Sequence, residues 1–347
     1  MKKSLLALAA ITAFTGVASA QSSVTLFGVV DLAARNTKNG SQSIQSLTHG
    51  GNATSRLGFR GVEDLGGGLR AGFWIEGEVV PDTGNPAGMT WQRRSTVSLM
   101  GGFGEVRLGR DYTPSFWNHV IFDPFGFIGV GGNSSVISTL GSGAGTLVRA
   151  NNSIGYFLPA MGGIYGQVMV TAGENASPAA AAPLNTWNKY LGARIGYAAG
   201  PVNVAVAYGK TDRGTLADFK DLNAGASYNL GFMTLMARYG KTEAGAVEQT
   251  NAQFGATVPL GAGTFKASYT KASGTGTSFD ATLMAVGYVY DLSKRTALYT
   301  AFSRVNNDGT AAAGARFTAG GAGPAFPAVN GGGLTSTGYE FGVRHNF

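Results

Sequence analysis

The sequence predicts an all-β fold, a closed antiparallel barrel whose strands cross a lipid bilayer. Charged residues make up only 13% of the 347 residues, about half of the usual share in soluble domains. After the first twenty residues, no apolar stretch approaches the roughly 18 residues of a membrane helix. The chain ends in STGYEFGVRHNF, whose alternation gives a strand one apolar and one polar face. Strands that face lipid on one side satisfy all three observations.

The first twenty residues, MKKSLLALAAITAFTGVASA, have the pattern of a cleaved secretory signal. Two lysines precede an apolar run from Leu5 to Val17, and small residues stand at Ala18 and Ala20, as in signals removed during export. We therefore expect residues 1–20 to be removed and the chain to leave a bacterial cytoplasm. The sequence contains no cysteine, which suits an oxidising periplasm and leaves no disulfide or thiol chemistry.

The remaining residues, 21–347, are expected to form one barrel domain. They contain sixteen candidate strands, each of about the length that a tilted membrane strand needs. The strands are predicted near 24–35, 55–64, 68–79, 91–101, 104–112, 150–158, 163–173, 188–199, 201–210, 219–230, 233–241, 249–259, 263–271, 280–291, 296–305 and 335–347.

The connections between these strands alternate between short and long. Short ones such as DLGGG, GGFG and PAMGG are tight turns rich in Gly, Pro, Asn and Asp. The others are mostly longer, at 36–54, 80–90, 113–149, 174–187 and 306–334, with shorter ones near 211–218, 242–248 and 272–279. This layout is typical of outer-membrane barrels, which have short periplasmic turns and long extracellular loops.

Charged residues within the strands share one face. In SRLGFRGVED, Arg56 and Arg60 alternate with apolar residues, and in LRAGFWIEGE, Glu76 and Glu78 do the same together with Trp74. An arginine facing lipid at the bilayer midplane would cost about 2–4 kcal/mol, so we expect these charges to face inward. Two segments, VTLFGVVDLA and MAVGYVYDL, are apolar on both faces, which is consistent with contact to a neighbouring subunit rather than lipid.

Several stretches resemble the general porins of β-proteobacteria, of the Bordetella, Burkholderia, Neisseria and Comamonas type. They are TSRLGFRGVEDLGGGLRAGFWIEGE, WQRRSTVSLMGGFGEVRLGRDYTP, RANNSIGYFLPAMGG, GYVYDLSKRTALY and the terminal GVRHNF. The resemblance implies a sixteen-stranded homotrimeric barrel in the outer membrane of a Gram-negative cell, in contact with lipid and lipopolysaccharide. It also implies that the third long loop folds into the lumen and that the barrel-assembly machinery reads the terminal aromatic residue, Phe347.

The predicted third loop, 113–149, is too long for a structureless connection in a compact domain, which indicates a functional role. Asp123 is its only acidic residue and Arg149 ends it. Resemblance to the anion-selective members of the family places a basic cluster at the pore constriction, at positions matching Arg56, Arg93 and Arg149. Strand alternation independently turns Arg56 and Arg149 inward.

Alternation and resemblance conflict at Arg93. Val97 and Leu99 share its parity and are expected to face lipid, so alternation turns Arg94 inward instead. A bulge between Arg93 and Val97 would restore Arg93 to the lumen. The further lumen candidates are Arg60, Arg94, Glu76, Glu78, Asp111 and Asp123.

These features predict a water-filled channel for the passive diffusion of small hydrophilic solutes and ions, with a preference for small anions. Three arginines about 8 Å from a passing ion contribute about 0.5 kcal/mol each, enough to enrich anions about tenfold. Pairing of the arginines with the nearby acids would instead leave a neutral constriction. Two alternatives stay open: a substrate-specific channel lined by inward aromatic residues, of which Trp74 is nearly the only one expected, and a surface adhesion barrel.

The sequence gives little support to an enzyme, a metal site or a nucleic-acid-binding protein. The three histidines, His49, His119 and His345, are scattered and have no metal-ligand spacing. Only His119, in the third loop, is a conceivable catalytic residue, and a hydrogen-bonding role in the loop is the simpler interpretation. Basic residues are dispersed along the chain, unlike a nucleic-acid-binding patch. We expect no cofactor.

Overall fold

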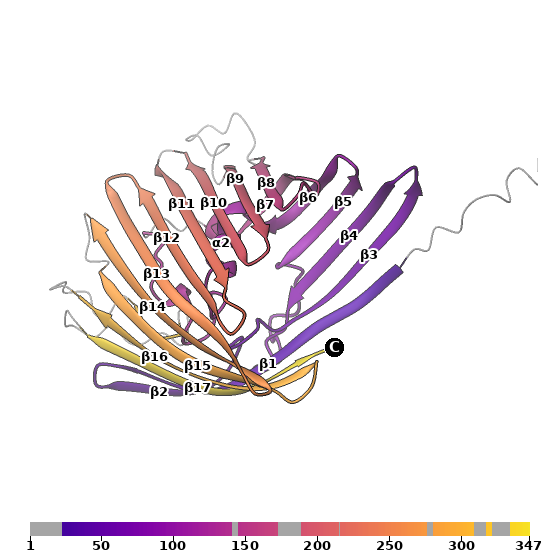
Figure 1. Cartoon of the computed structure of the whole chain (residues 1–347). Coiled ribbons are helices and arrows are strands. Elements are labelled where there is room, and N and C mark those ends of the chain that lie inside the picture. Colours follow the sequence, from indigo (N-terminus) through magenta and orange to yellow (C-terminus); the bar gives the residue numbers. More distant parts are fainter. Residues whose placement is uncertain are drawn as a thin grey trace, which may run out of the picture.

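The computed structural model describes residues 23–140, 145–172, 189–214, 216–275, 280–308, 317–320 and 334–347. The predicted signal segment, 1–20, lies outside these residues, as do the predicted loop 174–187 and most of the loop 306–334. Strands account for most of the described residues (Figure 1). None of their helices is long and apolar enough to cross a membrane.

The described strands are joined in sequence order by short turns and by longer connections. Their bounds are β1 Ser23–Asn39, β2 Gln42–His49, β3 Arg56–Gly66, β4 Leu69–Glu78, β5 Arg94–Gly101, β6 Gly104–Tyr112, β7 Arg149–Phe157, β8 Ile164–Thr171, β9 Lys189–Ala199, β10 Val202–Arg213, β11 Leu216–Asn229, β12 Thr234–Ala244, β13 Val247–Leu260, β14 Gly263–Thr275, β15 Ala281–Asp291, β16 Thr296–Asn307 and β17 Thr335–Asn346.

Sixteen of these strands, β1 and β3 to β17, form a closed antiparallel ring in the described part of the chain (Figure 1). From β3 onward each strand pairs with the next, and β1 pairs with both β3 and β17, in a register that places Asp31 opposite Arg344. The terminal residue extends this seam, because the backbones of Gly28 and Phe347 exchange two hydrogen bonds of 3.0 and 3.1 Å. The predicted sixteen-stranded barrel is confirmed.

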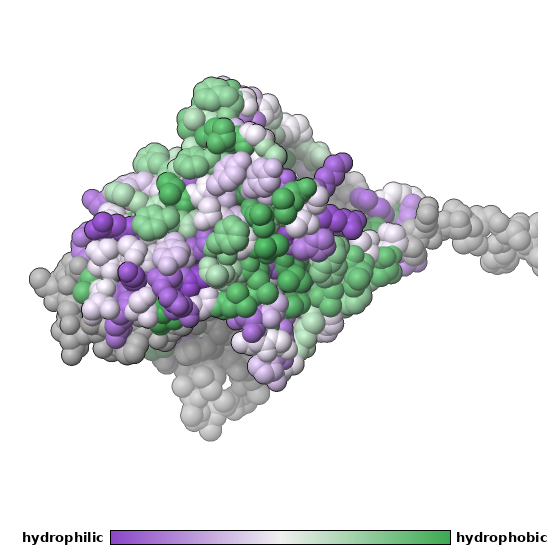
Figure 2. Space-filling view, turned by 90° about the horizontal axis from the view of Figure 1, so that it is seen from below, coloured by the Kyte–Doolittle hydropathy of each residue, from purple (hydrophilic) through white to green (hydrophobic). Residues whose placement is uncertain are grey.

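The two faces of the strands differ as the alternation predicts. Along β17, Tyr339 and Phe341 are more than half exposed on the outside, whereas Glu340 between them is 1% exposed and faces the interior. Figure 2 shows an outer face on which hydrophobic side chains form a continuous central area, with hydrophilic side chains on both sides of it. An apolar outer band around a polar interior is the pattern of a barrel that sits in lipid.

The strand β2 is absent from the prediction. The expected first long loop, 36–54, is mostly strand. The strand β1 continues to Asn39, and its part from Leu32 onward pairs with β2 as a hairpin. Its sequence, QSIQSLTH, is mostly polar on both faces, so it carries little of the alternation that marks a strand. The expected short loops near 211–218 and 242–248 are likewise largely taken up by longer strands, and β14 extends to Thr275 within the third, near 272–279.

The third long connection, between β6 and β7, lies inside the ring (Figure 1). It begins with helix α2 (Pro114–Ile121), which starts at a proline, the residue that suits a first helical position because it lacks an N–H. Two short 3₁₀ turns follow, η1 (Asn133–Ser135) and η2 (Gly145–Leu147).

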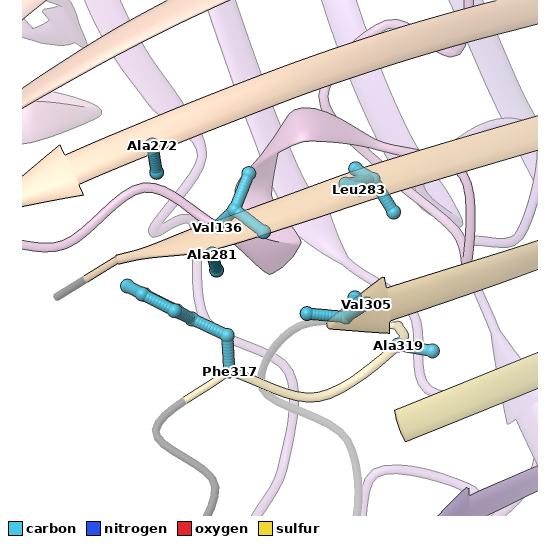
Figure 3. Close-up of a cluster of buried hydrophobic side chains, with 7 residues drawn as sticks. All are labelled: Val136, Ala272, Ala281, Leu283, Val305, Phe317 and Ala319. Carbon is cyan, nitrogen blue, oxygen red and sulfur yellow. The ribbon is translucent and has the colours of Figure 1, made fainter. Parts of the chain in front are cut away.

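Apolar side chains hold this connection against the inner wall. Val136 packs with Leu283 of β15 and Val305 of β16, and the same cluster contains Phe317 and Ala319 from the last long connection (Figure 3). Each of these five side chains is at most 7% exposed. Two connections that are far apart in sequence therefore meet inside the barrel.

The same packing accounts for the strands that are apolar on both faces. In β15, the inward Ala285 packs against Phe125 and Val130 of the third connection. In β1, the inward Phe27 lies 4.8 Å from Trp74, between ring centroids. The inner apolar residues thus have partners within the same chain, and contact with another subunit is not needed to explain them.

Candidate functional site

A cavity of about 670 Å³ opens in the lumen between the third connection and the wall that contains β1 and β3 to β7. The charged side chains that line it are Arg56, Arg60, Arg93, Arg94, Arg149 and Lys266, together with Glu76 and Asp123. The structure therefore brings together the three predicted constriction arginines, although they lie far apart in the sequence. Six basic and two acidic side chains face the same space.

Three neighbours hold the carboxylate of Glu76. The Nε of Arg93 donates to Oε1 at 2.6 Å, and the indole N–H of Trp74 donates to Oε2 at 3.1 Å. The Nε of Arg56 lies 4.0 Å from Oε1. Since Glu76 is only 5% exposed, these partners and its burial limit the negative charge that it presents to the water-filled space.

The hydroxyl oxygen of Tyr112 accepts hydrogen bonds from two arginines. The Nη2 of Arg93 lies 2.7 Å away and the Nη2 of Arg149 lies 2.9 Å away. The guanidinium carbon of Arg149 is also 4.4 Å from the centroid of the Tyr112 ring. Among the described residues no carboxylate pairs with Arg149, so its charge is not neutralised.

Asp111 lies behind the cavity and pairs with two other arginines. Its carboxylate is 2.6 Å from Arg107 and 3.5 Å from Arg94, and it is 1% exposed. Arg107 also pairs with Glu105 at 2.9 Å. The predicted lumen acid Asp111 is thus a buried partner of the basic residues and does not line the cavity.

Arg60 lies beside aromatic rings rather than a carboxylate. Its guanidinium carbon is 5.4 Å from the ring centroid of Phe27 and 5.2 Å from that of Trp74. On the same indole, the guanidinium carbon of Arg94 lies 4.5 Å from the centroid. Aromatic faces attract cations, so Trp74 fixes two guanidinium groups without neutralising them.

Arg93 and Arg94 both line the cavity. The strand β5 begins at Arg94, which lies opposite Glu76 in an unbroken register. The bulge that alternation required between Arg93 and Val97 is therefore absent. Arg93 precedes the strand, where strict alternation does not apply, and this resolves the conflict between the two predictions.

Asp123 anchors the third connection. Its carboxylate accepts hydrogen bonds from the backbone N–H groups of Phe125, Phe127 and Asn133 at 2.9, 3.0 and 2.9 Å. The amide of Gln253 donates to it from the wall at 3.1 Å. Burial raises the pKa of Asp123, and the hydrogen bonds from backbone N–H groups oppose that rise. Asp123 is only 4% exposed, so it adds little negative charge to the lumen.

The remaining predicted residues lie apart from the cavity. Glu78 accepts a hydrogen bond from the exposed amide of Gln92 at 2.9 Å. His119 is buried, with Nε2 3.0 Å from Asp221 and 3.2 Å from the amide of Asn223. Burial lowers the pKa of His119, and the negative charge of Asp221 opposes that shift. A histidine so enclosed supports the hydrogen-bonding interpretation rather than a catalytic one.

Several basic lumen residues are absent from the prediction. Lys266 of β14 lines the cavity, and Arg194 of β9 donates to the side-chain oxygen of Asn118 in α2 at 2.7 Å. Arg238 of β12 is buried beside Asn251. Strand alternation could have predicted these three lumen residues, because each lies on the inward face of its strand.

Aromatic residues in the lumen are also more numerous than expected. Those that line the cavity are Phe27, Trp74, Tyr112, Phe116, Trp117 and Phe125. Most of them come from the third connection or pack on it, where alternation gives no guidance. The expectation that Trp74 is nearly the only inward aromatic residue is wrong.

Comparisons with known proteins match the whole described barrel. A family profile described as Gram-negative porin matches residues 7–310. The outer membrane porin protein 32 of Delftia acidovorans is 39% identical and aligns over 100% of both chains. Another outer membrane porin protein, from Bordetella pertussis, is 28% identical over 88% of this chain and 95% of its own. A solved structure described as an anion-selective porin from Comamonas acidovorans superposes with a TM-score of 0.84 at 35% identity, covering 94% of this chain and 100% of that one.

Proposed function

This chain belongs to the Gram-negative porin family and is an outer-membrane channel protein, and from that premise we propose that its lumen is a general diffusion pore that prefers small anions. The solutes are small hydrophilic molecules and ions that cross passively. The third connection narrows the pore, and Arg56, Arg93 and Arg149 form the basic side of the constriction. Arg60, Arg94 and Lys266 extend the positive field along the wall.

The observation that carries this proposal is the charge balance of the cavity. Six basic side chains line it against two acidic ones, and both acids, Glu76 and Asp123, are buried and hydrogen-bonded. Arg60, Arg149 and Lys266 pair with no carboxylate among the described residues, so a net positive charge remains although Glu76 pairs with Arg93. Each guanidinium about 8 Å from an ion contributes about 0.5 kcal/mol in water, which is strong enough to select anions and weak enough to release them.

The similarity to a porin described as anion-selective, at 35% identity, supports the same preference. The test is the zero-current potential of the purified protein in a planar bilayer with a tenfold gradient of potassium chloride. We expect a chloride-to-potassium permeability ratio above one. A ratio at or below one contradicts the proposal, and high salt is expected to reduce the ratio because it screens exposed charges.

A substrate-specific channel is the second candidate, because aromatic residues line the cavity. A path for sugars needs exposed aromatic faces, whereas Phe116 and Phe125 are buried and Trp74 is covered by two guanidinium groups. Liposome swelling with neutral sugars of increasing mass separates the two candidates. A smooth decline with mass supports general diffusion, and saturation by one sugar supports the specific channel. An adhesion barrel would instead bind host ligands through its loops, and nothing in the described loops favours one.

The proposed oligomeric state and membrane location are those implied by the resemblance to β-proteobacterial porins. We infer a homotrimer embedded in outer-membrane lipid and lipopolysaccharide, after removal of residues 1–20. The terminal Phe347 is the residue that the barrel-assembly machinery would recognise. The proposal assigns the protein no enzymatic activity, no cofactor and no nucleic-acid partner. Cross-linking in native membranes tests the trimer independently of conductance.

A further inference from the structure

We infer that Trp74, an uncharged residue, is a positioning residue that sets the strength of the anion preference by fixing two arginines and one carboxylate of the lumen wall. The inference rests on the proposed anion preference and concerns the same site. Trp74 need not touch a passing ion in this role, because it acts through its charged neighbours.

The Trp74 indole has three charged neighbours. Its N–H donates to the Oε2 of Glu76 at 3.1 Å. Its ring lies 4.5 Å from the guanidinium carbon of Arg94 and 5.2 Å from that of Arg60. Phe27 supports the ring from β1, with ring centroids 4.8 Å apart and planes tilted by 58°.

The strand register explains why these groups meet at Trp74. Trp74 lies in β4, opposite Arg60 of β3 on one side and opposite Thr96 of β5 on the other. Arg94 is two residues before Thr96, so its long side chain reaches back over the indole. One rigid ring therefore links the inward faces of three adjacent strands.

Loss of the indole would change the field in two ways. Arg60 pairs with no carboxylate among the described residues, so without the ring its flexible side chain is free to move away from the ion path. At the same time the Oε2 atom of Glu76 would lose its donor and present more negative charge to the water. Both changes lower anion attraction while every charged residue remains in place.

The test uses Trp74→Leu and Trp74→Phe in the full-length protein refolded in planar bilayers. We expect Trp74→Leu to lower the chloride-to-potassium permeability ratio by about twofold, the size expected if the charge of Arg60 leaves the ion path. Trp74→Phe keeps an aromatic face but loses the N–H, so it is expected to fall between Trp74→Leu and the wild type. The matched control is Trp91→Leu, since Trp91 is exposed and packs on Phe59 outside the cavity, and it is expected to leave the ratio unchanged.

A double-mutant cycle separates a positioning role from a general structural one. In an Arg60→Gln, Arg94→Gln background, Trp74→Leu is expected to lose most of its effect on the ratio, because its partners are gone. An equal effect in both backgrounds overturns the inference. So does an unchanged ratio in Trp74→Leu protein of normal unit conductance, and if that variant does not fold, an unchanged ratio in Trp74→Phe does the same. A wild-type ratio at or below one instead refutes the proposed anion preference, and the inference with it.

Discussion

The side chain of Glu340, in the last strand, accepts a hydrogen bond from the backbone N–H of Val130, in the third connection, at 3.1 Å. Its other carboxylate oxygen lies 2.7 Å from Arg35 of β1. Both charged side chains are almost completely buried. The seam that closes the barrel and the loop that lies inside it are therefore joined through one carboxylate.

Replacement of Glu340 by alanine is expected to destabilise the protein by about 3–5 kcal/mol, because it leaves the buried Arg35 without its partner. The replacement also removes the hydrogen-bond acceptor of the Val130 N–H, so the third connection is held less firmly. We therefore expect more frequent brief channel closures in single-channel records. Thermal unfolding in detergent and bilayer recording measure the two effects. Glu78→Ala, at a solvent-exposed hydrogen bond, is the control, and equal behaviour of the two variants would refute the anchoring role.

Phe317→Ala is expected to loosen the third connection from the wall. Phe317 fills the cluster that also contains Val136 and Leu283 (Figure 3), and truncation of a buried phenylalanine costs about 3–5 kcal/mol. We expect a noisier open channel and faster proteolysis within the loop. Phe302→Ala removes a phenylalanine from the outer face and serves as the control. Identical current noise in the two variants would show that the cluster does not restrain the loop.

Arg93→Gln and Arg149→Gln are expected to differ, although each removes one positive charge. Arg149 has no carboxylate partner among the described residues, so its loss lowers anion preference by about twofold with little change in stability. Arg93 pairs with the buried Glu76, so its loss leaves that carboxylate with only the Trp74 N–H and the more distant Arg56 and lowers both anion preference and stability. Reversal potentials and unfolding temperatures of both variants test this. A larger stability loss in Arg149→Gln would contradict it.

Acid is expected to weaken the attachment of α2 through His119. Burial lowers the pKa of His119, so the folded protein binds a proton there less readily than the unfolded chain, in which histidine has a pKa of about 6.5. The stabilising effect of neutral His119 is complete above this value and is lost as the pH falls below it. The unfolding temperature of the wild type is therefore expected to fall more steeply than that of His119→Gln between about pH 7 and about pH 5. Parallel curves would count against this role for His119.

Gly28→Ala is expected to slow or impair closure of the barrel. A Cβ atom at Gly28 would collide with the ring of Phe347 and with the backbone oxygen of Arg56. The heat-modifiable shift in electrophoretic mobility during refolding measures closure. Gly102→Ala is the control, because a Cβ atom at Gly102 meets nothing within 4 Å. Equal refolding rates of both variants would exclude the predicted collision.

Strand alternation was sufficient to predict the barrel, because each wall strand must separate lipid from water. All sixteen predicted ring strands are present, and the inward positions of Arg56 and Arg60 followed from parity alone. The strand β2 was not predictable in this way, since its residues are mostly polar on both faces. Local sequence carries no pairing information for such a hairpin.

The sequence predicted most of the charged residues that line the cavity. It did not predict which of them pair with one another. Parity cannot place Arg93, which precedes its strand, or show that Asp123 turns toward its own loop. The roles of Trp74 and Tyr112 depend on distances between strands that the sequence does not give. The pairing of the buried Glu76 and Asp111 with arginines was also out of reach.

The seam between β1 and β17 makes the barrel a structure that only a finished polypeptide can adopt. Until β17 is available for pairing, β1 has an edge with unpaired backbone groups. Such an edge can pair with other chains and is unstable in the hydrocarbon of a membrane. Secretion must therefore deliver the polypeptide to its destination still unfolded and shielded. Loss of even a few residues at the carboxyl end would harm biogenesis more than loss of a similar length from an extracellular loop.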